Sequence, residues 1–353
     1  MKKVLIFSDL HIAKHKHSMN RLEDCLNTLE WVFKTAVSKG IKHILFCGDL
    51  FHDRQKIDVQ TYQKTFELFE KYVPTNNIEI YLLLGNHDLW HMQRWDISSV
   101  IPLRSIKGVT VVDKPCTLDV AGHPVSFLPY THNPAEDLKS ITNNADTKIL
   151  CGHVAIDGAV LNTMHQTHAE VAVEHDGDMI KVGAEIFDGW DHVFLGHYHG
   201  EQKLQYNVEY IGSPLQLSFG EAFQHKHVLI FDLETHEKEY IRNTFSPTHL
   251  IIRKDDVSKY ELANNFIWIM VEDISQADLI DLRTEILSAN TVGSIEFKSV
   301  EKKVEETLVE DAKAIMLKEG EMLEKYVESQ KSTIGELKED KLLEIGRQIC
   351  NAS

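Results

Sequence analysis

The stretch Ile44-Leu45-Phe46-Cys47-Gly48-Asp49-Leu50 passes from an apolar run directly to polar residues, and the predicted fold rests on this pattern. The same change follows the apolar runs 4–7 and 78–84. Between the first two runs, residues 21–39 carry apolar side chains near helical spacing. This order predicts βαβ units in a sheet that helices cover. Continuous apolar runs are also typical of strands that are buried on both faces.

The later part of the chain has a different pattern. From about Asp113, shorter strands predict a second, more antiparallel sheet, with strands at 117–120, 125–128, 193–195, 208–211 and 227–231. From Ser246, strand signals at 249–253, 266–271 and 292–298 and a helical signal at 275–288 predict a small α+β cap. Beyond Glu301, a helical apolar stripe lies in dense charge at 304–326, and a second helix is expected at 333–349. We therefore predict three domains, at residues 1–245, 246–300 and 301–353.

Composition is that of a soluble globular protein with 353 residues, of which 43% are apolar and 26% charged. No apolar run approaches the roughly 18 residues of a membrane span. The run after Met1 is too short for a signal peptide. We thus predict no membrane partner and a cytoplasmic location, in the host if a phage encodes the chain. The five cysteines lack a CxxC pair, which argues against a thiolate metal site. The net charge of −17 does not favour nucleic acid unless a basic strip, metals or a partner supply positive charge.

Five polar blocks at predicted strand ends carry the residue types that bind metals: Ser8-Asp9-Leu10-His11, Gly48-Asp49-Leu50-Phe51-His52-Asp53-Arg54, Gly85-Asn86-His87-Asp88, Gly152-His153 and Gly196-His197-Tyr198-His199. Side chains at positions i and i+2 of a strand point the same way, so Asp9 and His11 would reach one point if their strand continues through them. The same holds for His197 and His199. A single histidine is more often structural, but five such blocks in order predict a metal centre.

These blocks resemble, in full and in order, the DxH, GDLxH, GNHD, GH and GHxH signature of the calcineurin-like metallophosphoesterases, over residues 9–199. The resemblance implies an α/β fold, a four-layer αββα sandwich, with two divalent cations that share Asp49. It implies that one cation is held by Asp9, His11, Asp49 and His199, and the other by Asp49, Asn86, His153 and His197. Two such cations can neutralise the attacking and leaving oxygens of an in-line displacement. The ligands suit Mn²⁺, Zn²⁺ or Fe. The nuclease branch of the family implies Mn²⁺, with Mg²⁺ as an alternative.

Three further residues in the blocks are candidates for catalysis. His87 is the predicted proton donor to the leaving oxygen, or a stabiliser of the transition state. Asp88 would orient the His87 imidazole, or only cap a turn. His52 stands in a block that resembles the GDLFH block of SbcD-type nucleases, so it would handle the DNA end or a phosphate, with a structural role as the alternative.

A second family segment and several basic residues point to DNA. Residues 210–222, YIGSPLQLSFGEA, resemble the YxGSPxxLSFxE segment of SbcD-type nucleases. Its Ser213 would lie in a loop whose amides meet a phosphate, or in a plain turn. The candidate DNA contacts beside the metal blocks are Lys14, Lys16, Arg21, Arg54, Lys56 and Arg94. For any single one of these, a solvated surface position is the simpler explanation.

Together these features predict a DNA exonuclease and endonuclease subunit of an SbcCD-type complex for recombination, repair or replication. The resemblance implies a homodimer and an SbcC-type ABC ATPase partner, whose coiled coil would bind the helices after Glu301 unless these pack within the chain. A stand-alone phosphatase or small-nucleotide phosphodiesterase is the alternative, because it would use the same ions. A metal-stabilised scaffold is the third hypothesis, and the complete ligand set argues against it.

Overall fold

The first sheet carries the predicted βαβ order. The structure, a computed structural model, describes residues 2–15, 18–91, 94–160, 173–175, 178–180, 182–205, 207–272, 274–289 and 292–299. The sheet has six strands in the order β16-β15-β1-β2-β3-β6. Its parallel strands are β1 (Lys3–Phe7), β2 (His43–Phe46), β3 (Glu79–Leu83) and β6 (Val109–Val112). At one side, β15 (His227–Asp232) and β16 (Lys238–Arg242) run antiparallel. The predicted strand at 227–231 thus belongs to this sheet and not to the second one.

The second sheet also has six strands, in the order β13-β14-β12-β9-β8-β7. Four of them run parallel: β8 (His123–Leu128), β9 (Ile149–His153), β12 (His192–Gly196) and β14 (Val208–Tyr210). Only the outer strands β7 (Cys116–Val120) and β13 (Gln202–Lys203) pair antiparallel. The expectation of a mainly antiparallel sheet is wrong, because long crossover segments return the chain to the same end between the inner strands. Short pairs are formed by β4 (Leu89–His91) with β5 (Arg94–Ser98) and by β10 (Val173–His175) with β11 (Asp178–Ile180).

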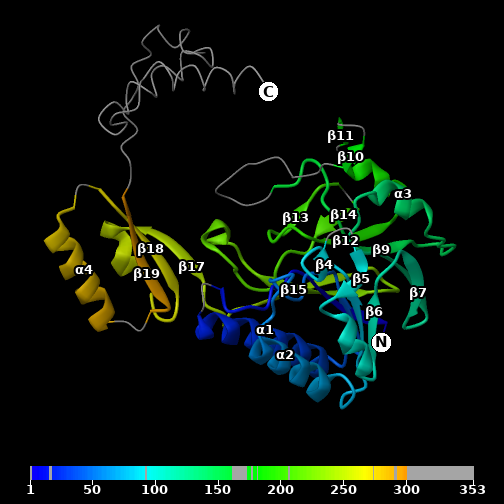
Figure 1. Ribbon diagram of the computed structural model, residues 1–353, viewed down its shortest axis with the longest axis horizontal. Coiled ribbons are helices and arrows are strands. Elements are labelled where there is room, and N and C mark those ends of the chain that lie inside the picture. Colours follow the sequence, from blue (N-terminus) through cyan, green and yellow to red (C-terminus); the bar gives the residue numbers. More distant parts are fainter. Residues whose placement is uncertain are drawn as a thin grey trace, which may run out of the picture. The chain divides into compact units, whose positions relative to one another are not determined.

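Strand β1 is buried on both faces. Val4 and Ile6 lie in the core between the two sheets. Leu5 and Phe7 lie in the core that contains the apolar side chains of helix α1 (Met19–Ser38). Figure 1 shows α1 beside α2 (Val59–Tyr72), and the two helices contact each other. The helix predicted at 21–39 is confirmed, and it begins earlier because Ser18 accepts a hydrogen bond from the backbone of Arg21 as its N-cap.

A third core covers the other face of the second sheet. It includes Leu128, Leu150 and Val193 from the strands, with Leu138 from helix α3 (Pro134–Lys139). The short 3₁₀ helix η3 (Ala184–Phe187) adds Ala184 and Phe187 to this core, whereas η2 (Ile101–Ser105) adds Leu103 to the core beside α1. The 3₁₀ helix η4 (Phe219–Glu221) lies between β14 and β15 in the sequence. The order of layers is therefore helix, sheet, sheet, helix, as predicted.

The cap elements have a sheet and core of their own. Strands β17 (His249–Arg253), β18 (Phe266–Val271) and β19 (Ser294–Ser299) are parallel, and they are accompanied by η5 (Lys254–Lys259) and α4 (Gln276–Ala289). Ile267, Ile269 and Ile286 are buried in this core. The predicted α+β elements are confirmed. The helices predicted within 301–353 lie outside the described residues. Among the residues that are described, no helix has the length and apolar character needed to cross a membrane.

Candidate metal centre

The segments that follow β1 and β2 run side by side beyond the ends of the strands. The Asp9 amide donates to the Gly48 carbonyl at 2.9 Å, and the His11 amide donates to the Asp49 carbonyl at 3.1 Å. These backbone bonds hold three predicted ligands on two adjacent loops. Sites of open α/β sheets lie at this end of the parallel strands.

The backbone of these loops is not extended. The φ angles are 51° at Asp9, 48° at His11, 64° at Asp49 and 106° at His197. Asp9 and His11 therefore do not share one face of a continuing strand, and neither do His197 and His199, so that prediction is wrong. Left-handed backbone at non-glycine residues costs energy and persists where the surrounding structure imposes it. The ligands converge through these loop conformations instead.

Two glycines allow the ligands to approach. A Cβ atom on Gly85 would lie 2.1 Å from the Asp49 Oδ1 atom, which real side chains do not tolerate. Gly48 has a φ of 97°, and a Cβ there would lie 2.3 Å from His153 Nδ1. Both positions thus require glycine to bring Asp49 and His153 close together.

The first predicted ligand group, Asp9, His11, Asp49 and His199, is assembled around His11. Its Nε2 lies 3.1 Å from His199 Nε2 and 3.5 Å from Asp49 Oδ2. The distance from His11 Nε2 to Asp9 Oδ1 is 3.9 Å. Asp9, His11 and Asp49 are buried, and His199 is partly exposed. The potential ligand atoms of this group therefore converge on one small volume.

The second predicted group, Asp49, Asn86, His153 and His197, is assembled beside the first. The Asn86 Oδ1 atom lies 3.0 Å from His153 Nε2 and 3.1 Å from His197 Nδ1. His153 Nε2 is also 3.4 Å from Asp49 Oδ2, the oxygen that faces His11 in the first group. One carboxylate oxygen thus faces both groups, as a bridging ligand must.

The atoms in both groups are arranged as cation ligands. His153 Nδ1 donates to the Cys47 carbonyl at 2.7 Å, so the Nε2 atom of this ring has a lone pair for a cation once the ring is neutral. His199 Nδ1 lies 3.1 Å from a Glu221 carboxylate oxygen, so the neutral ring that donates to Glu221 also has a lone pair on Nε2. The donor set, carboxylate, amide oxygen and imidazole, suits hard or borderline divalent cations.

Burial and mutual charge set the protonation of the ligands. Burial lowers the pKa of His11 well below its usual range and that of His197 to about 3, so both rings are neutral. Burial opposes the charged form of His153 too, but the Asp49 carboxylate raises the pKa of His153 to about 9. Although burial raises the pKa of Asp49, His153 and His11 hold it well below its usual range. A cation that binds His153 near neutral pH therefore displaces a proton.

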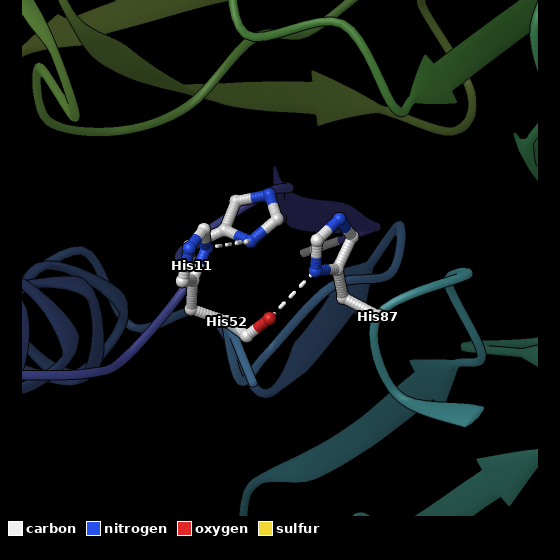
Figure 2. Close-up of side chains that lie close together, drawn as sticks. All are labelled: His11, His52 and His87. Atoms are coloured by element: carbon white, nitrogen blue, oxygen red, sulfur yellow. Dashed lines mark hydrogen bonds between the residues drawn. The ribbon is translucent and has the colours of Figure 1, made fainter. Parts of the chain in front are cut away.

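His87 and His52 stand beside His11 (Figure 2). The His52 carbonyl accepts a hydrogen bond from His87 Nδ1 at 2.6 Å, which fixes this ring and directs its Nε2 away from the bond. The His87 backbone amide donates to Asp49 Oδ1 at 2.7 Å. The His52 ring is 5.5 Å from the His87 ring and nearly parallel to it. The structure thus brings both predicted catalytic histidines to the metal ligands.

Asp88 does not contact the His87 imidazole, contrary to the predicted orienting role. Its buried carboxylate accepts hydrogen bonds from the backbone amides of Asp49, Leu50 and Gly85, each at 2.9 Å. Burial, followed by the neighbouring Asp49 charge, raises the Asp88 pKa to about 7. Asp88 therefore holds the loop that carries Asp49, which is closer to the turn-capping alternative.

A comparison with known protein families identifies this arrangement. The family model described as calcineurin-like phosphoesterase matches residues 2–201, which include all of the predicted ligands. The chain belongs to the calcineurin-like phosphoesterase family. The predicted α/β sandwich and the predicted enzyme class, a metal-dependent phosphodiesterase, are thereby confirmed.

Individual relatives of this phosphoesterase are distant in sequence. Exonuclease subunit 1 of Enterobacteria phage T4 is 26% identical over 229 residues, covering 63% of this chain and 61% of that protein. The SbcD component of the nuclease SbcCD of Escherichia coli strain K12 is 23% identical over 340 residues, covering 84% and 80%. The same component from Staphylococcus epidermidis is 24% identical over 275 residues, covering 69% of each. The chain thus matches less than two thirds of the length of the phage protein.

Of the predicted DNA contacts that the structure describes, Arg54 lies beside the predicted ligand Asn86 of this phosphoesterase. With the Asn86 amide turned so that its nitrogen faces the histidines, its oxygen accepts from Arg54 Nη2 at 2.8 Å. The buried Arg54 Nε has no hydrogen-bond partner among the described residues. If Asn86 Oδ1 held a cation instead, the amide nitrogen would face Arg54, and the guanidinium would lack this acceptor.

The other predicted DNA contacts are placed differently. Lys14 pairs with Asp58 at 3.0 Å, and Lys56 is exposed. Arg21 is buried and pairs with Asp24 at 3.0 Å, so it is not a surface contact. Lys16 lies outside the described residues, and so does the side chain of Arg94.

Ser213 is also not available to DNA. It is 1% exposed, and its hydroxyl donates to the Leu215 carbonyl at 2.8 Å. Its Oγ also lies 3.2 Å from a Glu221 oxygen and 3.0 Å from Lys226 Nζ. The Ser213 backbone amide, which was predicted to meet a phosphate, donates to the His199 carbonyl at 3.0 Å instead.

Glu221 and Lys226 are functional candidates that the sequence analysis missed. Glu221 is 3% exposed, and its two oxygens contact His199 Nδ1 at 3.1 Å and Lys226 Nζ at 2.7 Å. A carboxylate on the far nitrogen of a ligand histidine fixes the orientation of the ring and raises its basicity. The only sequence signal was an acidic residue at the end of the family segment at 210–222.

Replacing Glu221 by Gln is expected to weaken Mn²⁺ binding at the first ligand group by about 10- to 100-fold. The amide cannot supply the negative charge that polarises the His199 ring. Titration calorimetry should show one weakened site, while the site that contains His153 and His197 changes little.

Glu209→Gln is the matched control. Glu209 is a buried glutamate that pairs with Lys238 at 2.9 Å, away from the ligands. The Glu209→Gln substitution should lower thermal stability without changing Mn²⁺ affinity. If both variants lose Mn²⁺ affinity equally, Glu221 acts through general stability and not through His199.

Proposed function

We propose that this phosphoesterase is a nuclease that hydrolyses DNA phosphodiesters at strand ends and in single strands. The observation that carries the chemistry is that Asp49 Oδ2 faces ligand histidines of both groups, at 3.5 Å from His11 and 3.4 Å from His153. The choice of DNA is supported by relatives whose names describe nucleases and an exonuclease. It is also supported by the family segment at 210–222.

The two ligand groups would hold a pair of divalent cations, which would polarise the phosphate and the attacking water. The protein contributes the remaining steps. Arg54, whose buried Nε has no partner among the described residues, binds a phosphate oxygen. His87, which donates from Nδ1 to the His52 carbonyl, would act as an imidazolium that gives its Nε2 proton to the leaving oxygen and becomes neutral. His52 shields this side of the centre and fixes the His87 ring.

Because the net charge is −17, the binding of an anionic substrate depends on local positive charge. Two bound cations would add a charge of about +4 at the one place where a phosphate must bind. The acidic remainder of the surface then repels DNA elsewhere. We therefore expect binding that is weak without metal and confined to the metal centre.

The test is cleavage of end-labelled linear duplex and of circular single-stranded DNA by the full chain with Mn²⁺, with and without a chelator. Bis-p-nitrophenyl phosphate serves as a small diester in parallel. Chelator-sensitive degradation of DNA is the expected result. Turnover of the small diester alone, also after a candidate ATPase is added, would favour a stand-alone phosphodiesterase instead.

We further propose that residues 301–353 bind an SbcC-type ATPase as the third domain of the chain, after the phosphoesterase domain at 1–245 and the cap at 246–300. The dense charge around a narrow apolar stripe in the sequence supports a partner helix. Deleting 301–353 should abolish co-purification with the ATPase and spare Mn²⁺-dependent hydrolysis of the small diester. If the deleted chain still co-purifies, the partner binds elsewhere.

Three further properties complete the proposal. Mn²⁺ is proposed as the working cation, and comparing Mn²⁺ with Mg²⁺ in the cleavage assay tests it. A homodimer is proposed from the family resemblance, and light scattering of the purified chain tests it. A cytoplasmic location fits a DNA substrate, and cell fractionation tests that assignment.

A further inference from the structure

A cavity of about 580 Å³ lies between the cap and the phosphoesterase domain. Its walls come from His15 and Arg21, from the loop around Phe219, and from Phe266 and Trp268 on β18. Such a volume is typical of pockets that hold a small organic group. None of these wall residues is among the predicted metal ligands.

The cavity is adjacent to the metal centre through two separate contacts. His15 Nε2 lies 2.8 Å from the carbonyl oxygen of the ligand His11, and the His15 ring is 4.8 Å from the His52 ring. On the other wall, the Leu217 amide donates at 3.2 Å to Glu221, which contacts the ligand His199. A molecule bound in the cavity would thus lie next to the first set of predicted metal ligands.

The walls combine the aromatic side chains of Phe219, Phe266 and Trp268 with polar groups. The Phe219 and Trp268 rings stack at 3.9 Å with an angle of 12° between their planes. The Arg21 guanidinium lies 4.7 Å from the centre of the Phe266 ring. Ser218 and Ser294 add hydroxyls, and Glu296 adds a carboxylate that pairs with Lys298 at 2.8 Å. Trp268 Nε1 is a buried donor without a hydrogen-bond partner among the described residues.

We propose that this cavity binds one unstacked nucleobase of the DNA strand whose phosphate lies at the metal centre. This proposal rests on the proposed nuclease function. A base has a flat apolar ring with donors and acceptors on its edge, and these match aromatic walls with scattered hydroxyl and carboxylate groups. A wholly apolar side chain from a protein partner would leave the buried Nε1 donor of Trp268 facing a group that cannot accept its hydrogen bond.

The pocket would determine which phosphodiesters are cleaved. A base in a duplex must leave its stack to enter, and contacts with the aromatic side chains of the cavity would offset part of the stacking that is lost. The free-energy cost of unstacking a base is smallest next to frayed ends, in hairpin loops and in single strands. The enzyme would therefore select unstacked positions without reading the base sequence.

The test uses 2-aminopurine, a fluorescent base whose emission falls when it stacks on aromatic rings. It is placed in turn at successive positions from the end of a single strand, and each strand is mixed with the full chain in Ca²⁺ to limit cleavage. We expect emission to change strongly at one position and little at its neighbours. Ser218→Trp, which places a bulky ring in the cavity wall, should remove this signal and weaken strand binding about tenfold.

Ser140→Trp is the control, because Ser140 is exposed and follows α3, which does not line the cavity. It should keep both the signal and the affinity. An equal response at all positions in a chain that cleaves DNA would overturn the base pocket and leave the nuclease function intact. Failure of the chain to cleave DNA at all would instead overturn the proposed function. The position scan on the unmodified chain decides the matter even if Ser218→Trp does not fold.

Discussion

Replacing Asp49 by Asn is expected to abolish binding of both cations and to lower hydrolysis of any phosphodiester by about 10³-fold or more. The same Asp49 oxygen faces His11 of one ligand group and His153 of the other, so one substitution affects both. The amide keeps the shape of the side chain but lacks its charge. Mn²⁺ titration calorimetry and turnover of bis-p-nitrophenyl phosphate measure the two losses. Asp119→Asn, at an exposed carboxylate on β7, should change neither.

Proton release gives this variant a second readout. In the metal-free protein the Asp49 charge raises the pKa of His153 to about 9, so His153 carries a proton near neutral pH and must lose it when a cation binds. The Mn²⁺ affinity of the unmodified chain should therefore rise with pH until about that value. Calorimetry in buffers with different ionisation enthalpies counts the protons released. Retention of one Mn²⁺ with normal affinity in Asp49→Asn would mean that the two groups do not share this carboxylate.

The sequence predicted which residues gather at the candidate metal centre better than it predicted their backbone conformation. Asp9, Asp49 and His197 stand where apolar runs end, and this position is visible from residue type alone. Their left-handed φ angles are not visible, because aspartate and histidine also occupy ordinary extended backbone. The prediction that paired ligands share one strand face failed for this reason. The glycines at 48 and 85 are visible in the sequence, but the contacts that require them are visible only in the structure.

Non-local pairing limited the prediction of the sheets. The strand at 227–231 alternates between two buried faces, with Val228 and Ile230 in one core and Leu229 and Phe231 in the other. A pattern of this kind identifies a buried strand but not its neighbour. Here the neighbour is β1, at the opposite end of the domain sequence. The parallel pairing of the second sheet was missed because it depends on crossovers and not on strand composition.

Groups that support the ligands were the hardest to predict. Glu221 lies 22 residues after His199 and meets it only in the folded chain. Lys226 has no sequence signal, since one lysine before an apolar strand is ordinary. Asp88 is the opposite case. Its position next to His87 in the sequence suggested a contact with the His87 ring, but its carboxylate accepts hydrogen bonds from three backbone amides instead.

Replacing His87 by Ala is expected to lower DNA cleavage by roughly 10²- to 10⁴-fold while both cations still bind. The side chain is not a predicted ligand, and the bond to Asp49 comes from the His87 backbone amide, which alanine retains. The loss should be much smaller for bis-p-nitrophenyl phosphate, because p-nitrophenolate leaves without a proton. Cleavage rates for both substrates and Mn²⁺ calorimetry together measure this difference. His123→Ala, at a histidine next to Lys2 and away from the ligands, should behave like the unmodified chain.

The ratio between the two substrates separates the roles that His87 can have. A proton donor affects the DNA reaction selectively, since only the alkoxide leaving group needs the proton. A residue that stabilises the charged transition state affects both reactions equally, because both phosphates acquire the same charge. Equal losses would therefore mean that another group near the centre donates the proton. The nearest candidate is His52, whose ring centre lies 5.5 Å from that of His87. Undiminished DNA cleavage by a folded His87→Ala chain would remove His87 from the chemistry altogether.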